Sequence, residues 1–61
     1  AENFSYAFTP EKYEKIIKEN DFVILGFYEN FFVLDTMLKF AKRFPKIKFV
    51  LVDSYLMHLS N

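Results

Sequence analysis

Residues 22–28 read Phe-Val-Ile-Leu-Gly-Phe-Tyr, an apolar run with no alternating polar positions. The run is too short for a buried helix and is rich in residues that favour strands, so it predicts a strand covered on both faces. Residues 47–53, Ile-Lys-Phe-Val-Leu-Val-Asp, form a second run of this kind. Two such strands separated by a helical segment indicate a parallel sheet.

The segment before residues 22–28 predicts a short strand followed by a helix. Phe and Tyr alternate with smaller residues over 4–8, the pattern of a strand with one well-buried face. Thr9 is suited to cap a helix and Pro10 to occupy its first position, while Glu11 complements the positive end of the helix dipole. The helix is expected to run to about Asn20 and to cover one side of the sheet with its apolar positions.

A second amphipathic helix is predicted between the two apolar runs, over residues 31–44. Asn30 is a suitable cap, and Pro45 ends the helix because its ring disfavours helical geometry in the preceding residue. The polar side carries an acid and several bases, whereas the apolar positions share one stripe. That stripe consists of Leu34, Met37, Leu38, Ala41 and Phe44, widened by Val33 and Phe40.

The predicted order is therefore β-α-β-α-β, an α/β fold in one domain over residues 1–61. Right-handed crossovers place the third strand between the first two, which gives a three-stranded, mainly parallel sheet of order 1-3-2 with one helix on each face. In residues 54–61 two leucines at helical spacing indicate the start of a third helix. In this arrangement residues 22–28 form an edge of the sheet.

Composition excludes several classes of function. The chain has 61 residues, of which 52% are apolar, including nine Phe and four Tyr, and it contains no Cys. A chain this apolar has enough side-chain area to fold, and without Cys it has no thiol chemistry, disulfides or cysteine zinc sites. No stretch reaches 18 apolar residues, so we expect no membrane partner. Residues 1–8 do not fit a signal peptide, which favours the cytoplasm without establishing it.

Eight acids balance eight bases, but they are unevenly distributed. Residues 1–35 hold seven acids and three lysines, and residues 36–61 hold five bases and one acid. The basic half suggests a phosphate-binding patch, yet Lys42 and Arg43 also complement the negative end of a helix. With no glycine-rich phosphate loop and no basic stripe, we expect no nucleic-acid partner. Net neutrality together with many aromatic residues favours self-association.

Three blocks resemble the N-terminal part of a thioredoxin or protein disulfide isomerase domain. They are Phe-Thr-Pro-Glu-Lys-Tyr-Glu-Lys-Ile-Ile (8–17), Val-Ile-Leu-Gly-Phe-Tyr (23–28) and Phe-Ala-Lys-Arg-Phe-Pro-Lys-Ile-Lys-Phe-Val-Leu-Val-Asp (40–53). The resemblance covers nearly the whole chain but only a little over half of that fold. It implies a shortened βαβαβ unit, either a natural remnant or an engineered protein.

The chain departs from this family where the redox chemistry should be. The family's Cys-x-x-Cys loop follows its second strand, but here Glu-Asn-Phe-Phe (29–32) follows and the segment is shorter. An ungapped match puts Phe32 and Asp35 at the cysteine positions, where neither can act as a thiolate. The family's buried carboxylate is matched by Gly26. The resemblance therefore carries over no catalytic residue, and we expect no enzyme activity and no cofactor.

Other candidate sites have simpler structural explanations. His58 is the only histidine and has no His or Cys partners, so we expect no metal site; Asp53 could help to bind a metal only if the last segment folds back. Glu29 and Asp35 suggest an acid/base pair, but acids near a helix start are favoured by its dipole alone. Three residues of the last segment offer hydroxyl groups without a base at a recognisable spacing: Ser54, Tyr55 and Ser60.

The strand edge is the strongest functional candidate. Residues 22–28 contain neither charge nor Pro to blunt an exposed edge. The adjacent pair Phe31-Phe32 is expected to place one ring in the core and the other over the open end of the sheet, with a docking patch as the alternative. The expected interface comprises Phe22, Ile24, Phe27, Tyr28, Phe31 and Phe32. We expect a non-catalytic module that forms a homodimer through this edge, or alternatively an adaptor that binds a peptide or protein there.

Overall fold

The structure, a computed structural model, describes residues 2–54 and 56. Its elements follow the order β1 (Phe4–Ala7), α1 (Pro10–Glu19), β2 (Val23–Tyr28), α2 (Phe31–Arg43) and β3 (Lys48–Asp53). The predicted ranges 22–28, 31–44 and 47–53 are each one residue too long. The helix start predicted in residues 54–61 lies largely outside the described residues.

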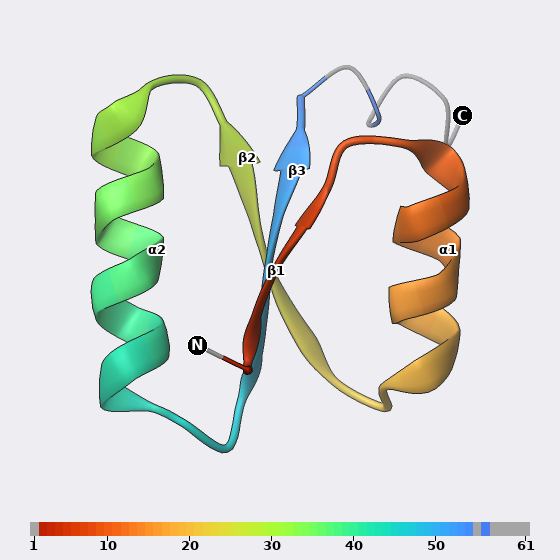
Figure 1. The fold of residues 1–61 in the computed structure, drawn as a ribbon, viewed down its shortest axis with the longest axis horizontal. Coiled ribbons are helices and arrows are strands. Elements are labelled where there is room, and N and C mark those ends of the chain that lie inside the picture. Colours follow the sequence, from red (N-terminus) through yellow and green to blue (C-terminus); the bar gives the residue numbers. More distant parts are fainter. Residues whose placement is uncertain (1, 55, 57–61) are drawn as a thin grey trace.

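The three strands form one parallel sheet in the order β1-β3-β2. Leu51 of β3 lies between Tyr6 of β1 and Gly26 of β2 in the register. Figure 1 shows α1 on one face of the sheet and α2 on the other. The predicted α/β fold, with its 1-3-2 order and one helix on each face, is confirmed.

Alternate residues of β3 supply two separate halves of the core. Val50 and Val52 pack on the α1 side with Ile16, whereas Phe49 and Leu51 pack on the α2 side. All four of these β3 side chains are buried because β3 is covered by a helix on each face and by a strand at each edge. The central strand therefore supplies four of the nine buried apolar residues in the described part of the chain.

Local hydrogen bonds fix where both helices begin. The Thr9 hydroxyl accepts from the backbone N–H of Lys12 at 3.3 Å. The Asn30 carboxamide oxygen accepts from the N–H groups of Phe32 and Val33 at 3.0 and 3.2 Å. Each bond satisfies donors that have no partner inside the helix, so the predicted caps are confirmed.

The prediction that the aromatic face of β1 is well buried is wrong. Tyr6 is 42% exposed and Phe8 is 41% exposed, while the fully buried residue of β1 is Ala7, on the opposite face. The reason is that α2 packs mainly over β2 and β3 and leaves most of β1 bare on that side. The rings of Phe4, Tyr6, Phe8 and Tyr28 instead contact one another edge to face, with centroids 5.3 to 6.1 Å apart.

Residues 23–28 pack against both halves of the core, but they are covered less than predicted. Every residue of β2 is only half-buried, in contrast to the four buried residues of β3. On the α1 side this follows from the position of the helix, which lies closer to β1 than to β2. The apolar side chains of β2 therefore retain surface on which another chain can pack.

Candidate functional site

The outer edge of β2 is the candidate site. Among the described residues β2 pairs with β3 alone, and β2 is the last strand of the sheet on that side. One backbone hydrogen bond shows in which direction the backbone groups of β3 point. The N–H of Phe49 donates to the carbonyl of Asn3 at 2.7 Å, so the N–H and C=O of Phe49 point toward β1. Because backbone groups alternate in direction along a strand, the N–H and C=O of the next residue, Val50, point toward β2.

The same alternation identifies which groups of β2 point outward. Val50 lies opposite Leu25 in the register. In a parallel pair, a residue facing its partner strand bonds to the two neighbours of the residue opposite, so the N–H and C=O of Leu25 itself point away from the sheet. The residues two positions to either side behave alike. Three residues thus present N–H and C=O groups at the open edge: Val23, Leu25 and Phe27.

The side chains around this edge are apolar and accessible. Phe22, immediately before β2, is 70% exposed. Phe27 belongs to the α1 side of the sheet, while Ile24 and Tyr28 pack on the α2 side, and all three are half-buried. Four of the predicted interface residues therefore border one continuous edge. The residues with outward backbone groups at 23 and 25 were not singled out from the sequence, because only the register assigns those directions.

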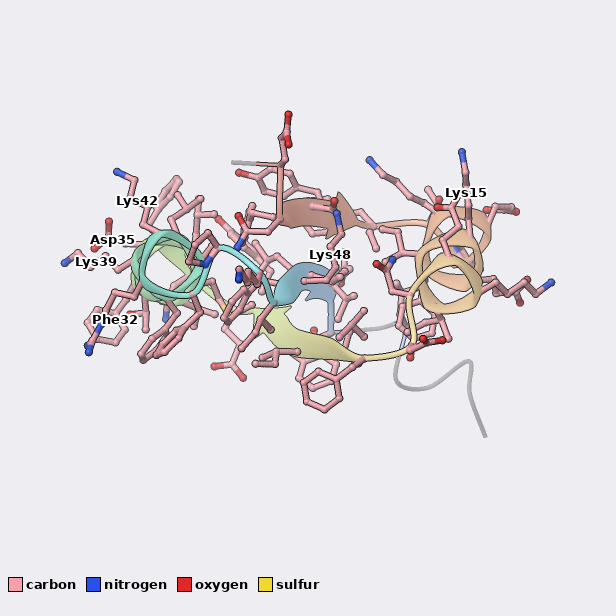
Figure 2. All side chains as sticks on the ribbon, turned by 90° about the horizontal axis from the view of Figure 1, so that it is seen from below. Lys15, Phe32, Asp35, Lys39, Lys42 and Lys48 are labelled. Carbon is pink, nitrogen blue, oxygen red and sulfur yellow. The ribbon has the colours of Figure 1, made fainter. Side chains whose placement is uncertain are left out.

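The expectation that one ring of the Phe31-Phe32 pair joins the core is wrong. Phe31 is 78% exposed and Phe32 is 77% exposed. Phe32 lies five residues before the buried Met37 in α2. At about 100° per residue the two side chains are about 140° apart around the helix axis, so the ring of Phe32 points away from the sheet. Figure 2 shows Phe32 on the outer side of α2. Both rings remain available as a docking surface next to the end of β2.

Two acids flank the apolar edge. Asp21 precedes the strand and Glu29 follows it, and both are exposed. Within β2 itself no charged residue and no Pro interrupts the six residues. The edge therefore has an apolar middle with an acidic residue beyond each end. A strand that pairs along the whole edge comes close to both acids.

The other candidate residues do not form a site in the described part of the chain. Asp35 forms an ion pair with Lys39 at 3.1 Å on the exposed side of α2, which gives this carboxylate a structural partner. Ser54 is exposed. His58, Tyr55 and Ser60 lie outside the described residues. No group of three or more His, Asp or Glu side chains suited to a metal occurs among residues 2–54 and 56.

Among the basic residues of the second half, Lys48 lies apart from Lys39 and Lys42. Figure 2 shows Lys39 and Lys42 on the outer side of α2, whereas Lys48 lies at the sheet, on the side of α1. No helix in the described part of the chain is long and apolar enough to cross a membrane.

Comparison with protein-family models, curated proteins and solved structures finds no match for this chain.

Proposed function

We propose that this chain is a non-catalytic association module whose β2 edge pairs with the β2 edge of a second copy. The observation that carries the proposal is the row of three outward-facing residues on β2, flanked by apolar side chains that are only half-buried. Such an edge is a template for another strand. Pairing with a second copy converts two open edges into the centre of a six-stranded sheet.

The three outward residues favour one particular register. Leu25 is the middle of the three, so a two-fold axis at Leu25 lets every outward residue face another one. In that antiparallel pair Leu25 opposes Leu25 of the second copy, and Val23 opposes Phe27. Shifting the register by two residues leaves outward groups at both ends without partners from β2. The centred register is therefore the one that satisfies the most backbone groups.

Side chains complement each other in the same register. Phe22 opposes Tyr28 of the second copy, an aromatic pair on the α2 side, and Ile24 opposes Gly26. Cross-strand aromatic and aliphatic pairs contribute about 0.2–1 kcal/mol each, and symmetry makes each unequal pair occur twice. Phe31 and Phe32 begin α2 on this side of the sheet and extend the apolar surface available for contact.

The non-catalytic part of the proposal rests on the residues present. The chain has no cysteine, and the Asp35 carboxylate is already paired with Lys39. We place the module with the thioredoxin-like domains, without their redox activity. The support is the sequence resemblance over residues 8–53 together with a β-α-β-α-β order and a helix on each face of the sheet.

A second candidate function uses the same edge for a different partner. In the centred register Asp21 faces Glu29 of the second copy at both ends, which is unfavourable for like charges. A peptide or protein strand with an apolar middle and basic ends would avoid this repulsion. An adaptor that binds such a strand is therefore the alternative, and it predicts a chain that stays monomeric until that partner is added.

Single cysteine substitutions test the proposal, since the chain contains no other cysteine. Leu25→Cys should form a disulfide-linked dimer on mild oxidation, because paired residues of an antiparallel ladder have Cα atoms about 5.5 Å apart, within disulfide range. Val23→Cys or Phe27→Cys alone should not cross-link, since like positions are about 13 Å apart along the strands. A mixture of these two variants should cross-link.

The outcomes separate the register from the association itself. Cross-linking of Val23→Cys alone, with none at position 25, would contradict the centred register while leaving a β2 interface in place. A chain that remains monomeric at millimolar concentration would contradict self-association and favour the adaptor.

A further inference from the structure

A polar groove lies on another side of the molecule, between α1 and the β1 side of the sheet. Its volume is about 480 Å³, within the range of small-ligand sites. Ser5 and Lys48 contribute from the sheet, and α1 contributes Lys12, Lys15 and Glu19. No residue of β2 lines it, so this groove is separate from the edge to which we assign self-association.

Lys48 is the unusual residue of the groove. It belongs to the central strand and faces the same side as the buried Val50 and Val52, where an ammonium group is costly. Its side-chain nitrogen donates to the Ser5 hydroxyl at 2.8 Å and to the Glu2 carbonyl at 3.3 Å. Both acceptors are neutral, so they orient the ammonium without balancing its charge.

No carboxylate of the described residues lies within ion-pair distance of that ammonium. Among residues 2–54 and 56 the ion pair within 4.0 Å is the one between Lys39 and Asp35, on the opposite face of the molecule. An ammonium has three N–H donors, and two acceptors are in place at Lys48. One donor is therefore available to a ligand that enters the groove.

The wall of the groove adds further positive charge. Lys12 and Lys15 lie one turn apart on α1, and Figure 2 shows Lys15 and Lys48 on the same side of the molecule as β1. Glu11 and Glu19 also line the groove, so three lysines face two glutamates. The net charge of these five side chains is positive, and the half-buried one among them is the Lys48 ammonium on the sheet.

We propose that this groove is an anion-binding site centred on Lys48, suited to a carboxylate or phosphate group. The ammonium of Lys48 donates to the anion while Ser5 and Glu2 hold the side chain in place. Lys12 and Lys15 attract the ligand from the wall of the groove. A charge-assisted hydrogen bond in a half-buried position is stronger than one at the open surface.

Titrations monitored by amide NMR shifts test the site on the full chain. The probes are inorganic phosphate and an acetylated, amidated pentaglutamate peptide, with pentaglutamine as the uncharged control. Shifts are expected at Ser5, along residues 12–19 and at Lys48. Comparison of the two affinities shows whether the site prefers a free anion or a carboxylate of a peptide.

Substitutions attribute the binding to Lys48. Lys48→Met keeps the length of the side chain and removes its charge, and it should weaken binding by at least about five-fold. Lys15→Gln, at an exposed helix position, should weaken it by a smaller factor and does not depend on the fold tolerating a change in β3. Lys39→Met, on α2, is the matched control and should leave the affinity unchanged.

The proposal is overturned if neither anion shifts these amides, or if the shifts persist with unchanged affinity in Lys48→Met. Equal binding of pentaglutamine would overturn it as well, because the charge would then contribute nothing. These results are independent of the oligomeric state, so they leave the β2 proposal unaffected.

Discussion

The side chain of Asn3 lies where α2 ends and β3 begins. The two N–H groups of its carboxamide are shared among the backbone carbonyls of Ala41, Phe44 and Ile47, at N···O distances of 2.9 to 3.1 Å. The backbone carbonyl of Asn3 accepts from the N–H of Phe49. Asn3, just before β1, therefore supplies a donor to the Ala41 carbonyl, which lies in the last turn of α2 and has no donor within the helix. Nothing in the sequence marks Asn3 for this role, because its partners are about forty positions away.

Asn3→Ala should lower the free energy of unfolding by about 1–3 kcal/mol, since it leaves partly buried carbonyls without a donor. The control is Asn20→Ala, whose carboxamide donates only to the carbonyl of Ile16 and which should cost less than about 1 kcal/mol. Urea denaturation followed by circular dichroism measures both. Equal costs for the two variants would contradict the role assigned to Asn3.

Gly26 leaves room for the end of the Met37 side chain. A methyl group at this position would lie 2.6 Å from Sδ and 2.7 Å from Cε of Met37. Gly26→Ala should therefore destabilise the chain by about 1 kcal/mol, at the low end of overpacking costs, because only the flexible end of the Met37 side chain must move. In a Met37→Val background the same change should cost clearly less. A double-mutant cycle in urea measures the coupling, and additive costs would contradict direct contact as the cause.

At the scale of elements, both helix starts were predictable from the sequence because they depend on neighbours within three residues. Thr9 and Asn30 cap the helices as expected. The burial of β1 and of the Phe31-Phe32 pair was not predictable in the same way, since it depends on where α2 lies across the sheet. Local patterns define each element, whereas packing decides which of its faces is covered.

The directions assigned to the backbone N–H groups of β2 predict that N-methylation has different effects at two adjacent residues. Chemical synthesis of a 61-residue chain can introduce each N-methyl group. N-methylation of Leu25 removes an outward N–H, so it should weaken self-association at least about ten-fold and preserve the helical circular dichroism signal. N-methylation of Ile24 removes an N–H that faces β3, so it should unfold the chain. Unfolding by the Leu25 modification would contradict the assigned directions.

Phe22 tests the side-chain part of the same interface. Because Phe22 is 70% exposed, Phe22→Ser should change the stability of the isolated chain by less than about 0.5 kcal/mol. It should nevertheless weaken the dimer, since the aromatic pair with Tyr28 of the second copy is lost twice. Tyr6→Ser, which removes an exposed aromatic ring from β1 at the opposite edge of the sheet, is the control. Equal weakening by the two variants would show that general hydrophobicity drives the association.

At the scale of the whole molecule, charge should act in opposite directions at the two proposed sites. Added NaCl screens the repulsion between Asp21 and Glu29 of the second copy, so it should strengthen the dimer by about two- to five-fold. The same salt should weaken anion binding at Lys48. Asp21→Asn should strengthen the dimer at low salt and reduce its salt response. A dimer weakened by salt would contradict the centred register.

The sequence was sufficient to predict the whole topology, because two apolar runs, two capped helices and right-handed crossovers allow few arrangements. It also identified β2 as an edge. It did not reveal the groove at Lys48, because one lysine among apolar residues on a central strand gives no pattern. Only the structure shows that this ammonium lies beside Ser5 and faces α1.

The most direct test of the central claim is the molar mass of the unmodified chain, measured by light scattering after size exclusion over a hundred-fold range of concentration. Pairing of β2 edges predicts a folded species that approaches twice the chain mass of 7.4 kDa as the concentration rises. A folded species that keeps the mass of a single chain throughout would contradict self-association through β2.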